Sequence, residues 1–341
     1  MAKTVPVDQA VGMILPHDVT EIRQGEFKGR AFKKGHIIRP EDIDHLKRLG
    51  KEHIYVLELG ADDIHENEAA LLMAQALAGS GITFPGDPVE GKLNLTASHA
   101  GLLQVNTEAL YHFNLVGEVM CATLHTDTVV AKGDLVGGTR LIPLVAKRQV
   151  VEKAVRIAKA AGGVLTVLPL RAAKAGLVIT GNEVFHGRIK DAFEPVLRQK
   201  MEAVGSEVVA VRFAPDEVTL IAAAIRDCLT DGADLIVTSG GMSVDPDDVT
   251  RLGIAAAGAT DIVYGTPVLP GAMFLVATIG QVPVLGLPAC GMFHKITVFD
   301  LVLPRVLAGQ KITRETLAAM GHGGLCRNCP QCHYPICPFG K

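Results

Sequence analysis

Acidic residues and glycines gather in three short segments that each follow an apolar run. The segments are "TGNEV" at 180–184, "TSGGMSVDPDD" at 238–248 and "GLPACGMF" at 286–293. Glycines leave room for backbone amides to approach an anionic ligand. Carboxylates such as those of Glu183 and Asp248 would repel a phosphate directly but suit an Mg²⁺ ion that bridges to it. These segments therefore predict a magnesium-dependent site for a phosphorylated ligand.

Asp245 allows two interpretations. In "DPDDV" it has the residue type favoured at the N-cap of a helix, with Pro246 at the first helical position. It also stands among the acids that could serve a cation. Both roles, helix cap and ligand-site residue, remain open from the sequence.

The elements that must position these loops alternate between strand and helix from residue 175 onward. Apolar runs predict strands at 175–181, 206–213 and 233–240, and a hairpin around Gly280 and Gln281. Helices are predicted at 191–205, at 216–232 and from about 292 to 308. Strands joined by crossover helices predict an α/β fold, with a mostly parallel sheet covered on both faces. Ligands of such sheets bind outside the carboxyl ends of the strands, where all three segments should meet.

Four motifs in this region resemble the molybdopterin-binding domain that molybdopterin molybdenumtransferases and adenylyltransferases share. They are "TGNEV", "GRIKD" at 187–191, "TSGGMSVDPDD", and "VPVLGLP" leading into a helix. The resemblance covers about residues 175–310, and a weaker one extends to the N-terminal "FKKGHIIRPEDIDHLKRLGKEHIYV".

The resemblance implies a function and a set of site residues. It implies that the protein binds molybdopterin or adenylylated molybdopterin and inserts molybdate with Mg²⁺-dependent release of AMP. It places Glu183 and Asp248 at the catalytic and magnesium site. The remaining residues that it assigns to cofactor binding are Thr180, Gly181, Asn182, Asp191, Ser239, Gly240, Gly241, Ser243, Asp245 and Pro288.

The sequence departs from the family pattern at several of these motifs. Asn182 replaces a common Asp, Ala192 and Phe193 replace Ser-Asn, and residues 289–291 (Ala-Cys-Gly) replace Gly-Asn-Pro. The N-terminal "DGYA" motif of molybdenumtransferases is absent from the sequence. Binding of molybdopterin is thus implied more directly than chemistry on it. Two alternatives stand beside the transferase: a non-catalytic molybdopterin carrier or sensor for a molybdoenzyme, and a nucleotide pyrophosphatase like the competence-damage-inducible proteins, suggested by "DPDDVTR".

Four cysteines lie close together near the end of the chain. Cys326, Cys329, Cys332 and Cys337 have the spacing C-x₂-C-x₂-C-x₄-C, and Pro338 follows the last. Closely spaced thiolates with little other folding material predict a metal site, either Zn²⁺ or a [4Fe–4S] cluster. The run of three cysteines and the proline favour an iron–sulfur cluster. A metal module on a mobile tail would suit docking to a redox enzyme or sensing of iron or oxygen. The alternative is a disordered end.

Length and composition divide the chain and limit its partners. The 341 residues are too many for one ordinary core. We expect a mixed N-terminal region at 1–84, a β-rich domain with a trailing helix at 85–174, the α/β domain at 175–310, and a spacer and cysteine tail at 311–341.

A net charge of −3 without a long basic run argues against nucleic acid as a partner. No signal-peptide or membrane-spanning pattern is present, so we expect no membrane and a cytoplasmic location. The expected small-molecule partners are molybdopterin and molybdate. We also expect a molybdoenzyme or another cofactor-biosynthesis protein as a partner. The resemblance alone implies a homo-oligomer.

Overall fold

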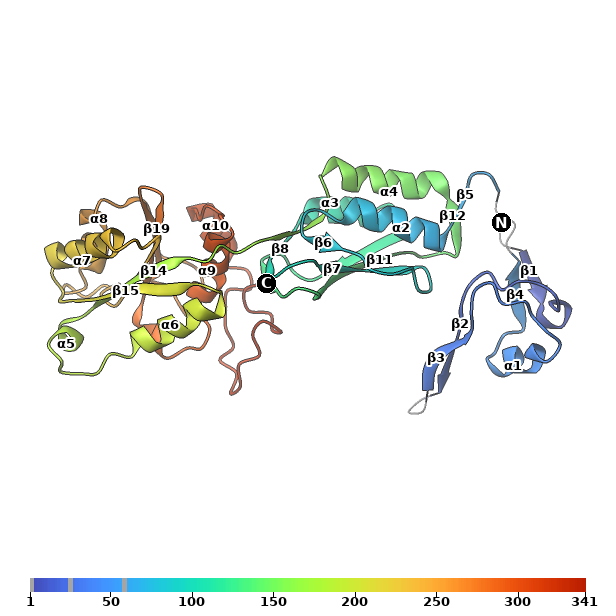
Figure 1. Cartoon of the computed structure of the whole chain (residues 1–341), viewed down its shortest axis with the longest axis horizontal. Helices are drawn as coiled ribbons and strands as arrows, with labels where there is room; N and C mark the ends of the chain where they lie inside the picture. The colour runs from blue at the N-terminus through green and yellow to red at the C-terminus, as the bar shows by residue number, and fades with distance from the viewer. Residues whose placement is uncertain (1–2, 24–26, 57–59) are drawn as a thin grey trace. The chain divides into compact units, whose positions relative to one another are not determined.

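The computed structural model describes residues 3–23, 27–56 and 60–341 (Figure 1). Contacts divide the chain into two compact units: residues 1–126 with 130–167, and residues 127–129 with 168–341. We name these unit 1 and unit 2. Among the described residues, no helix is long and apolar enough to cross a membrane.

The first part of unit 1 is built from short antiparallel pairs around a small core. β1 (Lys3–Pro6) pairs with β4 (His53–Val56), and β2 (Val19–Arg23) pairs with β3 (Phe27–Phe32). A 3₁₀ turn (Val7–Gln9) and α1 (Asp42–Arg48) complete it. The sequence "RPEDIDHLKRLG" at 39–50 predicts a helix, which α1 confirms, and "HIYVLEL" at 53–59 predicts a strand, which is confirmed as far as β4. Residues 57–59 of that strand lie outside the described residues.

The second part of unit 1 is a sheet covered by helices. Four strands pair antiparallel in the order β6-β7-β11-β9. Their bounds are β6 (Ile82–Thr83), β7 (Lys92–Ala97), β9 (Val119–Thr123) and β11 (Leu135–Leu141). The helices are α2 (Glu66–Leu77), α3 (Thr107–Asn114) and α4 (Arg148–Ala160), with Figure 1 showing them on the sheet. The remaining strands of unit 1 are β5 (Asp63–His65), β8 (Gly101–Val105) and β12 (Val145–Lys147). Two more strands, β10 (Thr128–Val130) and β13 (Leu165–Leu168), span the division between the two units.

One hydrophobic core joins this sheet to α2. Met73 and Leu77 of α2 are fully buried in the same cluster as Leu95 and Val136 of the sheet. The boundary predicted between residues 84 and 85 therefore lies inside a core, because α2 on one side of it packs against β7 and β11 on the other.

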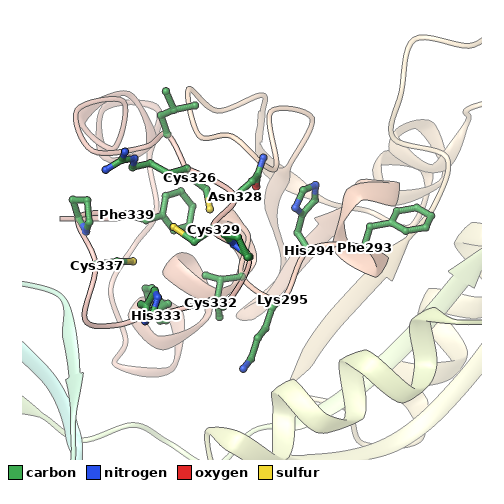
Figure 2. A pocket seen from close by; sticks show the side chains of 16 residues that line it. Phe293, His294, Lys295, Cys326, Asn328, Cys329, Cys332, His333, Cys337 and Phe339 are labelled. Carbon is green, nitrogen blue, oxygen red and sulfur yellow. The ribbon is translucent and has the colours of Figure 1, made fainter.

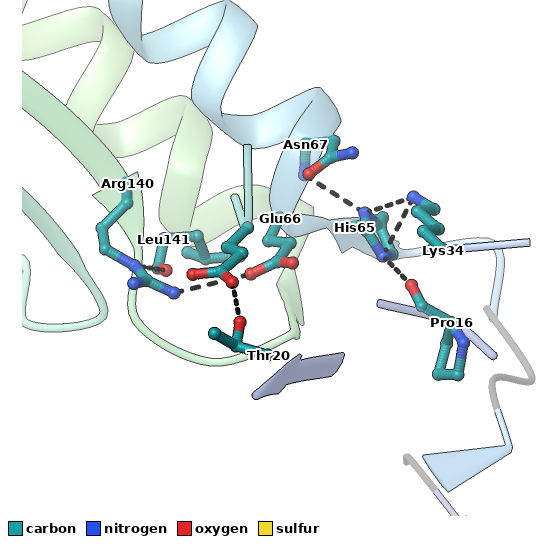
Figure 3. A network of polar contacts seen from close by, with 9 residues as sticks. Pro16, Thr20, Lys34, His65, Glu66, Asn67, Arg140 and Leu141 are labelled. Carbon is teal, nitrogen blue, oxygen red and sulfur yellow. Dashed lines mark hydrogen bonds and ion pairs between the residues drawn. The ribbon is translucent and has the colours of Figure 1, made fainter. Parts of the chain in front are cut away.

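A buried polar pair stands at the start of α2 (Figure 3). His65 Nδ1 accepts a hydrogen bond from the Asn67 amide at 3.1 Å, and His65 Nε2 is 3.1 Å from the Pro16 carbonyl oxygen. The Lys34 ammonium lies 3.1 Å from Nδ1. Burial and this neighbouring positive charge both lower the pKa of His65. Burial raises the pKa of the adjacent Glu66, although Arg140 lies 3.7 Å from its carboxylate.

Unit 2 contains the predicted α/β fold. Its six strands have the order β15-β14-β16-β19-β18-β17. The first four run parallel, β18 pairs antiparallel with β19, and β17 pairs antiparallel with β18 at the edge. The strands are β14 (Lys174–Thr180), β15 (Glu207–Ala214), β16 (Leu235–Ser239), β17 (Thr260–Tyr264), β18 (Leu275–Ile279) and β19 (Val282–Leu287). The predicted hairpin is β18 and β19. The mostly parallel sheet is thus confirmed.

Helices cover both faces of this sheet, each over its own core. One face carries α7 (Val218–Thr230) and α8 (Thr250–Ala256), and the other carries α6 (Phe193–Ala203) and α9 (Val298–Leu307). The spacing of Val218, Ile221, Ala222, Ile225 and Cys228 predicts one apolar face for α7. The last four are buried in this helix and Val218 is partly buried. The short helix α5 (Asn182–Phe185) follows β14, and a 3₁₀ turn (Ala289–Met292) follows β19.

The C-terminal segment packs on unit 2. α10 (Arg314–Ala319) buries Leu317, and Phe339 near the chain end is 3% exposed in the same core as α9. Leu325 forms a parallel bridge with Leu269. The predicted mobile or disordered tail is therefore wrong for this structure, because apolar side chains and backbone hydrogen bonds hold it on the α/β core.

Candidate functional site

A cavity of about 710 Å³ lies at the carboxyl ends of β14, β16 and β19. The loop after each of these strands contributes to its wall, as the three segments of the sequence predict. Asp216 from the loop after β15 also lines it, as do residues 269–273 from the connection between β17 and β18. The site is built from segments far apart in the sequence that the strand order brings to one edge.

The cavity brings together most of the predicted site residues. Those in its wall are Thr180, Gly181, Glu183, Asp191, Gly240, Gly241, Ser243, Asp245, Asp248 and Pro288. Two predicted residues are not in the wall. The Asn182 amide donates to Asp216 Oδ2 at 2.9 Å and its side-chain oxygen accepts from the Asp216 amide at 3.3 Å, so Asn182 ties two loops together. Ser239 is fully buried, and its hydroxyl has no hydrogen-bond partner within the described part of the chain.

Two threonines lock the loops of β14 and β16 to each other. Thr180 Oγ1 donates to the Ser239 carbonyl at 2.9 Å and lies 2.8 Å from Thr250 Oγ1, and all three residues are buried. Gly240 has φ +85°, and a Cβ there would lie 2.4 Å from the Thr180 carbonyl oxygen. Gly241 has φ +54°, and its Cβ would lie 2.2 Å from Thr250 Oγ1. Only glycines permit this approach, so the rim of the cavity is shaped before any ligand arrives.

Five carboxylates line the cavity, and four of them are without a helix-capping role. Asp248 Oδ2 accepts from the Ser243 amide at 2.9 Å, which fixes its orientation. Glu183 lies over Gly181, where a Cβ would be 2.9 Å from either carboxylate oxygen. Burial raises the pKa of Asp216, and the charges of Glu183 and Asp248 raise it further. With Asp245, these groups form a concentration of negative charge that would favour a cation.

Asp191 faces the cavity but already has partners. Its two carboxylate oxygens accept from the Phe193 amide at 2.9 Å and the Glu194 amide at 2.8 Å. It therefore caps the first turn of α6. Lys190 beside it also lines the cavity, where it supplies a positive charge for an anionic ligand.

The predicted helix start at Asp245 is wrong. α8 begins at Thr250, with Val249 as its N-cap residue. Asp245 lies in the irregular loop before the helix and in the cavity wall. The position favours the second of the two interpretations of Asp245, as a residue of the ligand site.

Three parts of the wall did not emerge from the sequence. Asp216 follows β15 in "APDEV", where the acids look like ordinary helix caps. Lys190 stands inside a recognised motif but has no distinctive spacing of its own. Residues 269–273 follow β17, which runs in the same direction as β19 and so also ends at this edge, but no motif in the sequence singles them out.

The four tail cysteines line a second cavity, of about 360 Å³ (Figure 2). Cys329 and Cys332 are exposed, whereas Cys326 and Cys337 are partly buried. Across residues 3–23, 27–56 and 60–341, no three His, Cys, Asp or Glu side chains stand together at metal-ligand positions. The cysteines thus surround one cavity without forming a closed ligand set.

Comparison with protein families locates a known domain type over the first cavity. Residues 176–308 match the model described as a probable molybdopterin binding domain. Every wall residue of the 710 Å³ cavity falls in this range. Residues 4–58 match a second model, described as a domain of unknown function.

Curated relatives match a short part of the chain. A CinA-like protein of Mycobacterium sp. (strain MCS) is 34% identical over 94 residues, which are 28% of this chain and 22% of the relative. A CinA-like protein of Mycobacterium avium (strain 104) is 40% identical over 78 residues, or 23% of this chain and 18% of the relative. The chain thus spans about a fifth of the length of these relatives.

Two solved structures are also similar to the chain. The molybdopterin biosynthesis enzyme MoaB from Thermus thermophilus aligns with a TM-score of 0.35 and 22% identity, covering 40% of this chain and 98% of that one. The protein CinA from Thermoplasma acidophilum aligns with a TM-score of 0.33 and 20% identity, covering 35% of this chain and 90% of that one.

Proposed function

We propose that unit 2 binds molybdopterin or adenylylated molybdopterin in the 710 Å³ cavity and inserts molybdate with Mg²⁺-dependent release of AMP. The observation that carries the proposal is the coincidence of the cavity with the matched family domain: all its wall residues lie within 176–308. The paired glycines Gly240 and Gly241 expose backbone to a ligand at its rim.

The donor set suits magnesium held jointly with a substrate. Mg²⁺ usually retains several waters and takes one or two protein carboxylates together with substrate phosphates. A closed cage of three protein ligands is therefore unnecessary. Glu183 and Asp248 line the same cavity as Asp216, whose pKa is raised by burial, and a bound cation would favour the ionised form of all three carboxylates. When bound, the ion would neutralise the pyrophosphate whose P–O bond is broken as AMP leaves.

The remaining wall residues hold and orient the substrate. Asp248 is held in place by the Ser243 amide, so its second oxygen keeps a fixed direction. Lys190 supplies positive charge to a phosphate, and the Thr180–Thr250 contact keeps the two glycine-containing loops together. These residues position the reacting groups before chemistry, which contributes to rate by reducing the entropy lost on the way to the transition state.

A single-turnover experiment tests the reaction. The full chain is mixed anaerobically with adenylylated molybdopterin, Mg²⁺ and molybdate, and both AMP release and molybdenum retention are measured. We expect AMP release coupled to molybdenum insertion, slowed about 100-fold or more in Glu183→Gln and in Asp248→Asn. Asp247→Asn is the matched control, because Asp247 is exposed in the same loop but outside the cavity wall. An Asp247→Asn loss as large as that of Asp248→Asn would contradict the assignment.

The similarity to CinA-like proteins over 94 residues favours a second candidate, a metal-dependent nucleotide pyrophosphatase. The same carboxylates would serve either reaction, so substrate preference distinguishes the pyrophosphatase from the transferase. Turnover of ADP-ribose-like dinucleotides in preference to adenylylated molybdopterin would establish the pyrophosphatase and contradict the transferase.

A carrier is the non-catalytic alternative. Tight retention of intact adenylylated molybdopterin without AMP release would indicate delivery to a molybdoenzyme or another cofactor-biosynthesis protein.

We propose further that the chain self-associates. Light scattering of the purified chain would test this, and a mass of one chain would contradict it.

A further inference from the structure

We propose that the cavity lined by the four tail cysteines is the site of a thiolate-bound metal centre, and that filling it fixes the backbone segments that link this cavity to the 710 Å³ cavity, here called the molybdopterin cavity. The first part is independent of the proposed function. The second part rests on the proposed function only in taking molybdopterin as the ligand of the 710 Å³ cavity.

The four cysteines line one cavity. Cys326, Cys329, Cys332 and Cys337 all line the 360 Å³ cavity, and Figure 2 shows their side chains arranged around it. The residues His294 and His333 line the same space and offer imidazole nitrogens. Thiolate and imidazole are the ligands that Zn²⁺ takes in structural sites, and four thiolates also hold a [4Fe–4S] cluster.

Apolar packing of Phe339 and the backbone hydrogen bond of Cys326 hold the two ends of the tail, but the stretch between them has no regular element. From residue 327 to the chain end it forms turns and bends without a helix or a strand, and Phe339 is its buried apolar anchor. The two exposed cysteines, Cys329 and Cys332, lie in this irregular stretch. A metal would cross-link it to the partly buried Cys326 and Cys337, which offsets the entropy lost by ordering so much chain.

The first connection between the cavities runs through Leu269. Its amide donates to the Gly324 carbonyl at 2.8 Å, and its carbonyl accepts from the Cys326 amide at 2.8 Å. The backbone of one candidate metal ligand is therefore bonded directly to a residue that lines the molybdopterin cavity. Pro270 and Gly271, which follow it, also line that cavity.

The second connection is the loop between β19 and α9. Cys290 and Met292 line the molybdopterin cavity, while the next residues, Phe293 to Ile296, line the cysteine cavity. The His294 amide donates to the Cys290 carbonyl at 3.1 Å, which joins the two stretches. Any shift of residues 293–296 on metal loading is thereby transmitted to the part of this loop that lines the molybdopterin cavity. We call residues 269–273 and 288–296 the shared wall.

Metal analysis of the full chain tests the site. The chain is loaded with Zn²⁺ alone, or anaerobically with Fe²⁺ and sulfide, and the bound metal is counted after desalting. We expect about one zinc, or about four iron with four sulfide, per chain. Cys329→Ser with Cys332→Ser should abolish binding without disturbing the core, because both side chains are exposed. Cys290→Ser, outside the cysteine cavity, should retain it. No stoichiometric metal in either arm, or retention by the double variant, would overturn the site.

Hydrogen exchange of the same samples, without molybdopterin, tests the shared wall. Metal loading should slow amide exchange in residues 269–273 and 288–296 at least tenfold, and the double variant should show no change on the same treatment. Bound metal with unchanged exchange there would overturn the coupling. Because neither readout uses molybdopterin or AMP release, failure here is distinguishable from failure of the proposed transferase.

Discussion

Two glycines set how closely the loops of the 710 Å³ cavity approach each other, and one of them has a matched counterpart elsewhere. Gly240 and Gly258 both have positive φ, but a Cβ at Gly258 meets nothing within 4 Å, whereas one at Gly240 meets the Thr180 carbonyl. Gly258→Ala should cost about 1–2 kcal/mol of unfolding free energy from backbone strain alone. Gly240→Ala should cost more than that, since a backbone oxygen cannot move aside, and should also weaken molybdopterin binding. Urea unfolding measures both, and equal losses would contradict the clash.

His65 should make the stability of unit 1 depend on pH. Burial and the charge of Lys34 lower the pKa of His65 in the folded chain. Below the ordinary pKa of about 6.5, the unfolded chain therefore binds a proton at His65 that the folded chain does not bind. The stabilisation from a neutral His65 is complete above that pH and is lost as pH falls through 6.5 towards the folded pKa, by at most about 1.4 kcal/mol per pH unit. His65→Asn keeps an N-cap residue and should flatten this slope between pH 7 and 5.5. An unchanged slope would assign the effect to other groups.

At the residue scale, the sequence predicted wall residues where a side chain of suitable chemistry stands inside a recognised motif. Glu183, Asp248 and the glycines of 240–241 lie in the cavity wall. It did not predict that Asn182 turns to Asp216, because that contact depends on the pairing of β14 with β15. Roles of the individual wall residues stay predictions until the variants are measured.

At the element scale, two helices on one face of the sheet meet at a glycine. Gly253 of α8 lies where a Cβ would be 2.5 Å from Ile221 Cγ2 of α7. Alanine normally favours a helix over glycine by about 1 kcal/mol, but overpacking a core costs about 1–3 kcal/mol. Gly253→Ala should therefore destabilise unit 2. Combined with Ile221→Ala, which removes the clashing methyl, it should cost less than the sum of the single changes, as a double-mutant cycle would show. Strict additivity would contradict the contact.

The sequence predicted the elements of unit 2 better than their ends. Parallel strands place their loops at one edge, so periodicity and glycine positions were enough to predict that three loops converge. The β17–β18 connection was missed, although β18 begins opposite the end of β19, with Leu275 paired to Gly286. The start of α8 was predicted too early, because Asp245 and Pro246 have the residue types of a helix start while lying in the cavity loop.

At the scale of the whole molecule, two compact units with separate cores should unfold separately. Calorimetry should show two transitions, and Met73→Ala, in the core of unit 1, should lower only one of them. Molybdopterin at 100 times its Kd should stabilise the other by about 2.7 kcal/mol. A single transition that responds to both changes would contradict this division.

Tertiary packing explains what the sequence could not show about the ends of the chain. The tail has one buried aromatic side chain, Phe339, and no periodic pattern, so nothing in its composition predicts that it packs on α9. The boundary at residue 84 followed a cluster of prolines and glycines, yet α2 shares a core with the strands after it. Local composition detects loops, whereas the extent of a core depends on contacts between distant segments.

The most direct test of the central claim is anaerobic equilibrium binding of molybdopterin to the full chain and to two variants that each add one large side chain. Ala289 is exposed and lines the cavity, so Ala289→Phe should fill it. Ala255 is exposed on α8 outside the wall, so Ala255→Phe is the control. We expect tight binding that Ala289→Phe weakens at least tenfold and Ala255→Phe leaves unchanged. Absence of binding, or binding unaffected by Ala289→Phe, would contradict a molybdopterin site at the carboxyl ends of these strands.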